Sequence, residues 1–271
     1  MNAGKLFRHE ISTTRILPMI GVYDVFSALI ASKYFDGIFI SGFSMAASYY
    51  GLPDIGFVNW RDQADLSNKI RHALPNAHLL VDIDDGFGDE HIASNTVRSL
   101  ELNGVSAIMM EDQKRPRKCG HFDYKEILPI DEYITKLECV LNTRNNLVVI
   151  ARTDSDDPIE SLHRAIAYAD VGADGIMIES IPNLDVIHEL REQIKCPIVV
   201  NQLHGGKSPN WTLNELEKAG VNIVIYSTPT LFAAQYGIEQ VLSEMKATNI
   251  MPVEKTTSMQ DCTNTLALYG S

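Results

Sequence analysis

Several cations surround a single cysteine in the stretch "EDQKRPRKCGH", which runs from Glu111 to His121. The stretch follows the apolar run "VSAIMM", which has the composition of a buried strand. Its basic side chains are Lys114, Arg115, Arg117 and Lys118. Cations beside a thiol lower its pKa, so we expect them to tune Cys119 and to draw an anionic substrate inward. The alternative is a solvated run of charges with an incidental buried cysteine.

Carboxylates gather where the other apolar runs end. The polar residues and glycines at these ends are Ser41, Gly42, Asp82, Asp84, Asp85, Glu111, Asp112, Arg152, Asp154, Glu179, Asn201 and Ser227. Carboxylates in one pocket repel one another unless they are protonated or bridged by a cation, and oxygen ligands with little histidine favour Mg²⁺ or Mn²⁺. Asp82 and Asp84 are two residues apart on one expected strand, so both should face one ion. The alternative is that each acid caps the following helix.

Arg152 ends another apolar run and lies outside the basic stretch. A guanidinium group at this position can bind a substrate carboxylate through two parallel hydrogen bonds. The alternative is an ion pair with Asp154 or Glu179. Both interpretations place Arg152 at the same end of the fold as the acids.

The elements that must position these residues alternate regularly along the chain. Eight short apolar runs are separated by stretches with apolar residues at three- and four-residue spacing, as in "DQADLSNKIRHAL" and "ESLHRAIAYADVGA". Eight strand–helix alternations predict an α/β protein with a (β/α)8 barrel, in which all strand ends converge on one mouth. A doubly wound open sheet is the alternative, but "GVYDVF" lacks the glycine fingerprint of such folds. We expect one catalytic barrel over residues 1–246 and a tail over residues 247–271.

Composition limits the classes of partner. The formal net charge of −12 over 271 residues argues against nucleic acid and anionic membranes as partners. The N-terminus lacks the apolar core of a signal peptide, and no run reaches membrane-spanning length. The four cysteines have no CxxC spacing, which suits reduced thiols. We expect a cytoplasmic protein that acts on a small anion.

Several segments together resemble the isocitrate lyase and phosphoenolpyruvate mutase superfamily over nearly all of the chain. They are "SGFSMAASYYGLPDIGF", "DIDDGFG", "RKCGH", "ARTD" and "NQLHGGKSP". The subgroup they resemble most contains methylisocitrate lyase, dimethylmalate lyase, oxaloacetate hydrolase and carboxyphosphonoenolpyruvate mutase. Simple phosphoenolpyruvate mutases have a different loop without the cysteine.

The resemblance implies roles for individual residues. Asp82 and Asp84 would hold Mg²⁺ or Mn²⁺, with Asp54 and Glu111 in the outer shell. Cys119 on a mobile loop would exchange a proton with the carbanion left by C–C cleavage, and His121 would shape that loop. The catalytic set it implies is Cys119, Arg152, His121 and Glu111. The substrate-binding set it implies is Ser41, Gly42, Phe43, Gly120, Arg152, Glu179, Asn201 and Leu203.

Five departures from the family pattern bear on the substrate. They are Phe39 in place of a tyrosine, Phe43 in place of a small residue, Phe232 in place of an arginine, His204 in place of a glutamate and Asp85 in place of Thr or Ala. Without that arginine, no cation stands at the position that grips a third carboxylate. The expected ligand is therefore a small hydroxy or oxo acid. The expected substrate is a 2-hydroxy dicarboxylate, which would be cleaved to an α-oxo acid and a carboxylate.

Two rival functions remain open, and one implication concerns assembly. A phosphonate-pathway enzyme, either carboxyphosphonoenolpyruvate mutase-like or a C–P hydrolase, shares much of the pattern. A barrel that has lost activity and serves as a scaffold is the second rival. The resemblance also implies a homo-oligomer, a dimer or tetramer, in which subunits exchange a C-terminal helix.

Overall fold

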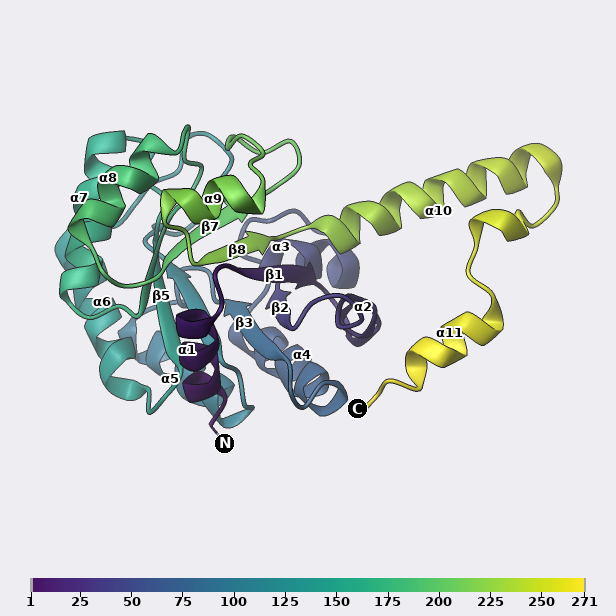
Figure 1. Cartoon of the computed structure of the whole chain (residues 1–271), viewed down its shortest axis with the longest axis horizontal. Coiled ribbons are helices and arrows are strands. Elements are labelled where there is room, and N and C mark those ends of the chain that lie inside the picture. Colours follow the sequence, from purple (N-terminus) through teal and green to yellow (C-terminus); the bar gives the residue numbers. More distant parts are fainter. Residues whose placement is uncertain (1, 271) are drawn as a thin grey trace.

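Eight parallel strands form a closed barrel in which each strand pairs with its neighbours in sequence order (Figure 1). The computed structural model describes residues 2–270. The strands are β1 (Leu17–Val22), β2 (Gly37–Ile40), β3 (His78–Asp82), β4 (Ala107–Glu111), β5 (Val148–Thr153), β6 (Gly175–Ile178), β7 (Ile198–Gln202) and β8 (Ile223–Tyr226). Every predicted apolar run contains one of these strands. The (β/α)8 barrel is confirmed.

Helices surround most of the barrel, and several of them begin at a residue whose side chain caps the first turn. They are α1 (Ala3–Thr13), α2 (Val25–Ala31), α3 (Gly42–Met45), η1 (Ala46–Tyr50), α4 (Trp60–Ala73), α5 (Glu90–Leu102), α6 (Ile130–Thr143), α7 (Pro158–Asp170), α8 (Asp185–Gln193), α9 (Leu213–Ala219), α10 (Pro229–Thr248), η2 (Val253–Lys255) and α11 (Met259–Leu266). Asn59 and Thr212 form capping boxes at α4 and α9, which satisfy first-turn amides. Within residues 2–270, no helix is both long and apolar enough to cross a membrane.

Two apolar layers hold the barrel together. Inside it, side chains such as Leu80, Met109 and Ile150 fill the interior, and Phe7 of α1 joins the same cluster. Outside it, alternate strand residues pack against the helices. Strands buried on both faces therefore read as continuous apolar runs, and the side chains at their carboxyl ends meet at one mouth.

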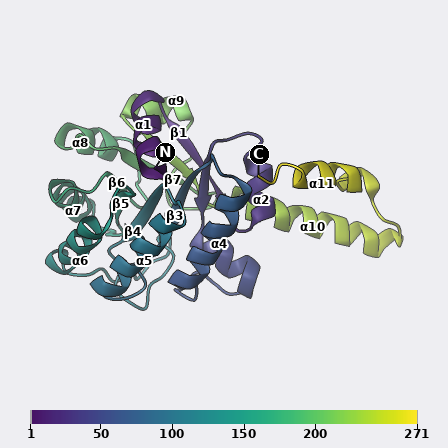
Figure 2. The same cartoon turned by 90° about the horizontal axis from the view of Figure 1, so that it is seen from below.

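The C-terminal segment departs from the regular alternation (Figures 1 and 2). Helix α10 projects away from the barrel and has no buried residue, and it continues through the expected boundary after residue 246. The chain then returns through α11 towards the barrel. Lys33 Nζ lies 2.6 Å from Thr265 Oγ1, and Gly270 N donates to Ala73 O at 2.8 Å. The outer face beside β8 is left without the helix that would complete the pattern.

Candidate active site

A small cavity of about 40 Å³ opens at the mouth of the barrel. Its lining residues are Phe39, Ser41, Phe43, Asp54, Asp82, Met109, Arg117, Cys119, Gly120, Arg152, Glu179, Asn201, Leu203, Ile225, Ser227 and Thr228. Most residues expected to bind substrate or do chemistry therefore line one cavity, although they lie on different strands and loops. Four other expected residues, Gly42, Asp84, Glu111 and His121, lie behind this lining and contact its members.

Asp82 and Asp84 approach each other by a route that differs from the predicted one. Strand β3 ends at Asp82, and Asp84, with a φ of 49°, lies in the turn that follows. The prediction that both acids lie on one strand is therefore wrong. The turn is held by Asp84 N, which donates to Asp82 Oδ1 at 3.2 Å. A Cβ atom built on Gly42 would lie 3.4 Å from Asp84 Oδ1 and 3.9 Å from Asp82 Oδ2. Both carboxylates therefore face Gly42, at distances where a methyl group would be in ordinary van der Waals contact with them.

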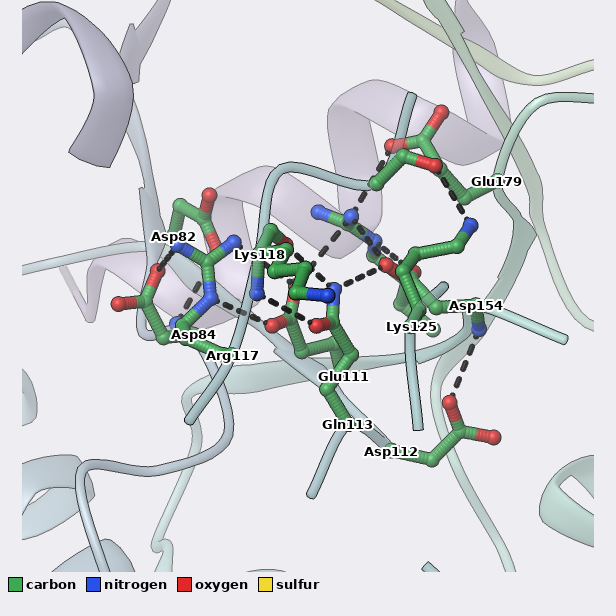
Figure 3. A network of polar contacts seen from close by, with 12 residues as sticks. Asp82, Asp84, Glu111, Asp112, Gln113, Arg117, Lys118, Lys125, Asp154 and Glu179 are labelled. Carbon is green, nitrogen blue, oxygen red and sulfur yellow. Dashed lines mark hydrogen bonds and ion pairs between the residues drawn. The ribbon is translucent and has the colours of Figure 1, made fainter. Parts of the chain in front are cut away.

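Arg117 lies among the buried acids (Figure 3). Its Nε is 2.7 Å from Glu111 Oε1, while NH1 is 2.5 Å from Asp54 Oδ1 and 3.4 Å from Asp84 Oδ1. The Arg117 side chain is 2% exposed. We predicted that this residue would tune the cysteine, but its guanidinium group is engaged by three carboxylates.

The buried acids carry more negative charge than the nearby cations balance. Burial raises the pKa of Asp84 to about 8, and Arg117 only partly opposes this. Burial likewise raises the pKa of Asp82 and Glu111. Gln63, which the sequence did not single out, donates from Nε2 to Asp82 O at 3.0 Å, while its buried Oε1 has no partner among the described residues. Buried carboxylates beside an unpaired acceptor fit a hydrated divalent cation.

Arg152 forms the ion pair that was the alternative to substrate binding. Its Nε and NH2 donate to the two carboxylate oxygens of Asp154 at 2.6 and 2.8 Å. NH2 also lies 3.2 Å from Glu111 Oε2 and 3.3 Å from Glu179 Oε2. Arg152 nevertheless lines the cavity, so the acids orient a guanidinium group in its wall.

The thiol of Cys119 is protonated at neutral pH. Burial raises its pKa to about 12, and the negative charge of Asp54 adds to the effect. The expected lowering by the basic stretch is therefore wrong, because the cations of that stretch bind other partners. Arg115 pairs with Asp85 at 2.6 Å, and Lys118 Nζ donates to Tyr124 O at 2.8 Å. A protonated thiol suits a proton donor.

His121 ties the loop of Cys119 to two neighbouring loops. Its Nε2 lies 3.3 Å from Glu179 Oε1, and its Nδ1 lies 3.1 Å from both Ser180 Oγ and Lys207 N. A Cβ atom on Gly206 would lie 2.9 Å from the imidazole, so glycine permits this close approach. We call residues 114–126 the lid loop, because they cover the cavity between these contacts.

A polar and an apolar wall meet at Phe43. Ser41 caps α3, so the amides of Gly42 and Phe43 lie in its first turn, where no intrahelical acceptor is available. The Phe43 ring contacts Phe232 of α10 edge-on, with centroids 6.3 Å apart and an interplanar angle of 72°. Phe39, 2% exposed, adds a third ring without a hydroxyl group.

Besides Gln63, sequence reasoning missed two further supporting residues, Lys125 and Gln113. Lys125 is 1% exposed, and its Nζ donates to Gly120 O at 2.6 Å and lies 3.1 Å from Asp156. Gln113 bonds to both the lid loop and Asp154. Both belong to the sequence around the cysteine, but their contacts depend on how the loop folds back, which spacing does not reveal.

Comparison with known proteins places the chain among enzymes of small acids. The family model described as phosphoenolpyruvate phosphomutase matches residues 7–246. The 2-methylisocitrate lyase of Bacillus subtilis is 34% identical over 244 residues, 89% of this chain and 80% of that protein. The 2,3-dimethylmalate lyase of Eubacterium barkeri is 32% identical over 252 residues, 91% of this chain and 87% of that protein.

Solved structures agree with this placement. Oxaloacetate acetylhydrolase in complex with the inhibitor 3,3-difluorooxalacetate superposes with a TM-score of 0.93 at 27% identity, covering 98% of this chain and 94% of that one. Phosphonopyruvate hydrolase in complex with oxalate and Mg²⁺ has a TM-score of 0.86 at 25% identity, covering 98% and 95%. The chain belongs to the phosphoenolpyruvate phosphomutase family, within the isocitrate lyase and phosphoenolpyruvate mutase superfamily.

Proposed function

We propose that this protein is a Mg²⁺-dependent carbon–carbon lyase that cleaves a small 2-hydroxy dicarboxylate to an α-oxo acid and a carboxylate. The observation that carries the proposal is the meeting of Cys119, Asp82 and Arg152 at one cavity. A proton donor, a buried carboxylate and an oriented guanidinium group are the parts that this reaction needs. The two lyases that resemble the chain support the same reaction type.

The metal would be held by Asp82 and Asp84. Among residues 2–270, no three histidine, cysteine or acidic side chains converge as ligands of one ion. Mg²⁺ commonly takes one or two carboxylates and fills its other positions with water and substrate oxygens, so a two-carboxylate site suits it. When bound, it would supply positive charge for the developing oxo-acid product. Asp54 and Glu111 would lie in the outer shell, where Arg117 already binds both.

The protein's own residues would act on the rest of the substrate. Arg152 and the first-turn amides of Gly42 and Phe43 would orient the oxo-acid end. The 2-hydroxyl gives its proton to solvent as the bond between C2 and C3 breaks, and the electron pair of that bond passes to C3 beside the second carboxylate. The thiol of Cys119 then donates its proton to C3, which leaves a thiolate to be reprotonated. Phe39 has no group that accepts the hydroxyl proton.

The walls of the cavity favour a short substrate with an apolar branch. Phe43 lines the cavity and contacts Phe232 behind it, and neither ring can balance a carboxylate. A buried carboxylate without a partner costs several kcal/mol. Dicarboxylates with methyl branches would therefore bind better than tricarboxylates such as methylisocitrate.

We also propose that subunits associate by exchanging α10. The helix has no buried residue, and it carries exposed apolar side chains that include Tyr236, Ile238 and Leu242. An apolar groove of about 640 Å³ lies beside its root, and its lining includes Ile20, Phe26 and Tyr226. An α10 helix from a second copy would cover the face that this chain leaves open.

A substrate screen tests the function. Purified protein with Mg²⁺ would be incubated with 2-hydroxy dicarboxylates, tricarboxylates and phosphonates, and released oxo acid and phosphate would be measured. The proposal expects oxo acid from a branched dicarboxylate. Phosphate release from a phosphonate alone would favour the rival enzyme class, and no turnover with any compound would favour a scaffold.

A further inference from the structure

The lid loop is anchored at its base by backbone pairing. Gln113 and Ile127 form an isolated antiparallel bridge. Lys114 N donates to Glu126 O at 2.7 Å, and Leu128 N donates to Asp112 O at 2.8 Å. These contacts fix where the loop leaves and rejoins the barrel. They do not fix where its middle, which carries Cys119, lies relative to the cavity.

The side chain of Gln113 reaches that middle part (Figure 3). Its Oε1 accepts from Lys118 N at 2.8 Å, and its Nε2 donates to Lys118 O at 2.7 Å. Both contacts are to backbone groups of the residue just before Cys119. Gln113 is 1% exposed, so water does not compete for these bonds. One side chain therefore binds both the backbone N–H and the backbone C=O of Lys118.

The same amide also contacts the residue that orients Arg152. Gln113 Nε2 donates to Asp154 Oδ2 at 2.6 Å. Burial alone would raise the pKa of Asp154, but Arg152 and the bond from Gln113 lower it, which keeps the acceptor ionised. Asp154 N in turn donates to Asp112 Oδ1 at 2.9 Å. The lid loop and Arg152 thus share one buried hydrogen-bonded unit.

A second glutamine shows which part of this arrangement is ordinary. Gln202, at the end of β7, holds Trp211 in the same two-point way, with Nε2 to Trp211 O at 2.7 Å and Trp211 N to Oε1 at 3.1 Å. Within residues 2–270, the Gln202 side chain makes no bond to Asp154 or to a residue that lines the cavity. A two-point hold on a loop is therefore a general structural device here, and the added bond to Asp154 distinguishes Gln113.

We propose that Gln113 is a positioning residue that holds the lid loop closed over the cavity and couples that closure to the orientation of Arg152. The coupling to catalysis rests on the proposed function of Cys119, whereas the closure of the loop does not. Loss of the Gln113 amide would release the backbone beside Cys119 and one of the bonds on Asp154. The loop would then open more often, and the thiol of Cys119, which is half-buried in the structure, would become more accessible.

Thiol alkylation measures this opening without any substrate. Wild type, Gln113→Met and Gln113→Glu would be treated with iodoacetamide at pH 8, and modification of each cysteine would be followed by peptide mass spectrometry. Gln113→Met removes both donor and acceptor at similar length. Gln113→Glu keeps the shape but loses the donor to Lys118 O and to Asp154. We expect alkylation of Cys119 to rise at least about tenfold in both, because each loses two or more buried hydrogen bonds.

Matched measurements separate positioning from general loss of structure. Glu126→Gln removes an exposed ion pair with Lys114 in the same loop and should leave the Cys119 rate unchanged. Cys139, Cys196 and Cys262 should keep wild-type rates in all variants. For oxo-acid release, kcat should fall at least about tenfold in both Gln113 variants with Mg²⁺ affinity unchanged. Cys119 alkylation within twofold of wild type in either folded Gln113 variant would overturn the proposal, even if no lyase substrate is found.

Discussion

Arg117 Nε lies 2.7 Å from Glu111 Oε1, and the two side chains are 2% and 0% exposed. This buried pair belongs to a cluster in which Arg117 also binds Asp54 and Asp84. Arg152 also lies 3.2 Å from Glu111, but two guanidinium groups cannot neutralise all of these carboxylates at this depth, where burial penalises every charge that stays unpaired. A divalent cation would therefore neutralise negative charge in the cluster that the arginines leave unpaired.

Removal of a metal ligand should abolish Mg²⁺ binding. Asp84→Asn keeps the size of the side chain but removes a hard anionic ligand from a site with two, so Mg²⁺ affinity should fall at least roughly a hundredfold. Isothermal titration measures it. Asp85→Asn is the matched control, because the Asp85 carboxylate is bound by Arg115 and should not contribute. Turnover that survives exhaustive chelation would contradict the metal assignment.

A cation at position 232 should change the preferred substrate. Phe232→Arg would place a guanidinium group beside Phe43, where a third carboxylate has no partner in the wild type. The ratio of kcat/KM for methylisocitrate to that for dimethylmalate should rise at least about tenfold. Phe232→Leu, which stays apolar, should leave the ratio unchanged. Efficient wild-type cleavage of either tricarboxylate, methylisocitrate or isocitrate, would show that another cation already serves this role.

The strand-ends of the barrel were predictable, whereas the pairing among their side chains was not. Apolar runs such as "LVVIARTD" are continuous because both faces of β5 are buried, and this pattern is visible in sequence. The convergence of Asp82, Arg152 and Glu179 then follows from the fold. Whether Arg152 binds a ligand or Asp154 depends on rotamers and on the neighbouring strand, which places Glu111 opposite Arg152.

The local geometry of the cysteine loop escaped prediction for a similar reason. Counting charges near Cys119 suggested a lowered pKa, but the sign is decided by burial and by which acids bind each cation. Asp84 was expected on a strand, yet its positive φ places it in a turn. Spacing along the chain cannot reveal such a turn, because it depends on contacts with β4 such as Glu111 N to Asp84 O at 2.8 Å.

Alkylation of Cys119 should require high pH. With a pKa of about 12 in place of the ordinary value of 9.0, the thiolate fraction at pH 8 is roughly a thousandfold lower than for a free thiol. Because the pKa is raised, the protonated thiol persists below pH 9 and is lost only as pH rises towards 12. The rate of modification of Cys119 should therefore keep increasing beyond pH 9, with N-acetylcysteine as the reference. A plateau reached by pH 7 would mean that the basic stretch lowers the pKa after all.

Disruption of α10 should dissociate the oligomer. Ile238→Asp with Leu242→Asp places charges on an exposed apolar surface of the helix, where an exchanged partner would bury them. Sedimentation velocity should show a shift from the dimer or tetramer to the monomer. Gln240→Asp adds a charge at a polar position of the same helix and should leave the oligomer intact. A wild type that sediments as a monomer at micromolar concentration would rule out the exchange.

Release of oxo acid from 2,3-dimethylmalate, compared between wild type and Cys119→Ser with Mg²⁺ present, tests the central claim most directly. A loop thiol contributes little packing, so the variant should fold and bind Mg²⁺ as the wild type does. Its kcat should be lower by at least ~10²-fold, the usual contribution of a general acid. Near-normal turnover in Cys119→Ser would contradict the account, because it would remove the thiol from the proton transfer on which the proposed cleavage depends.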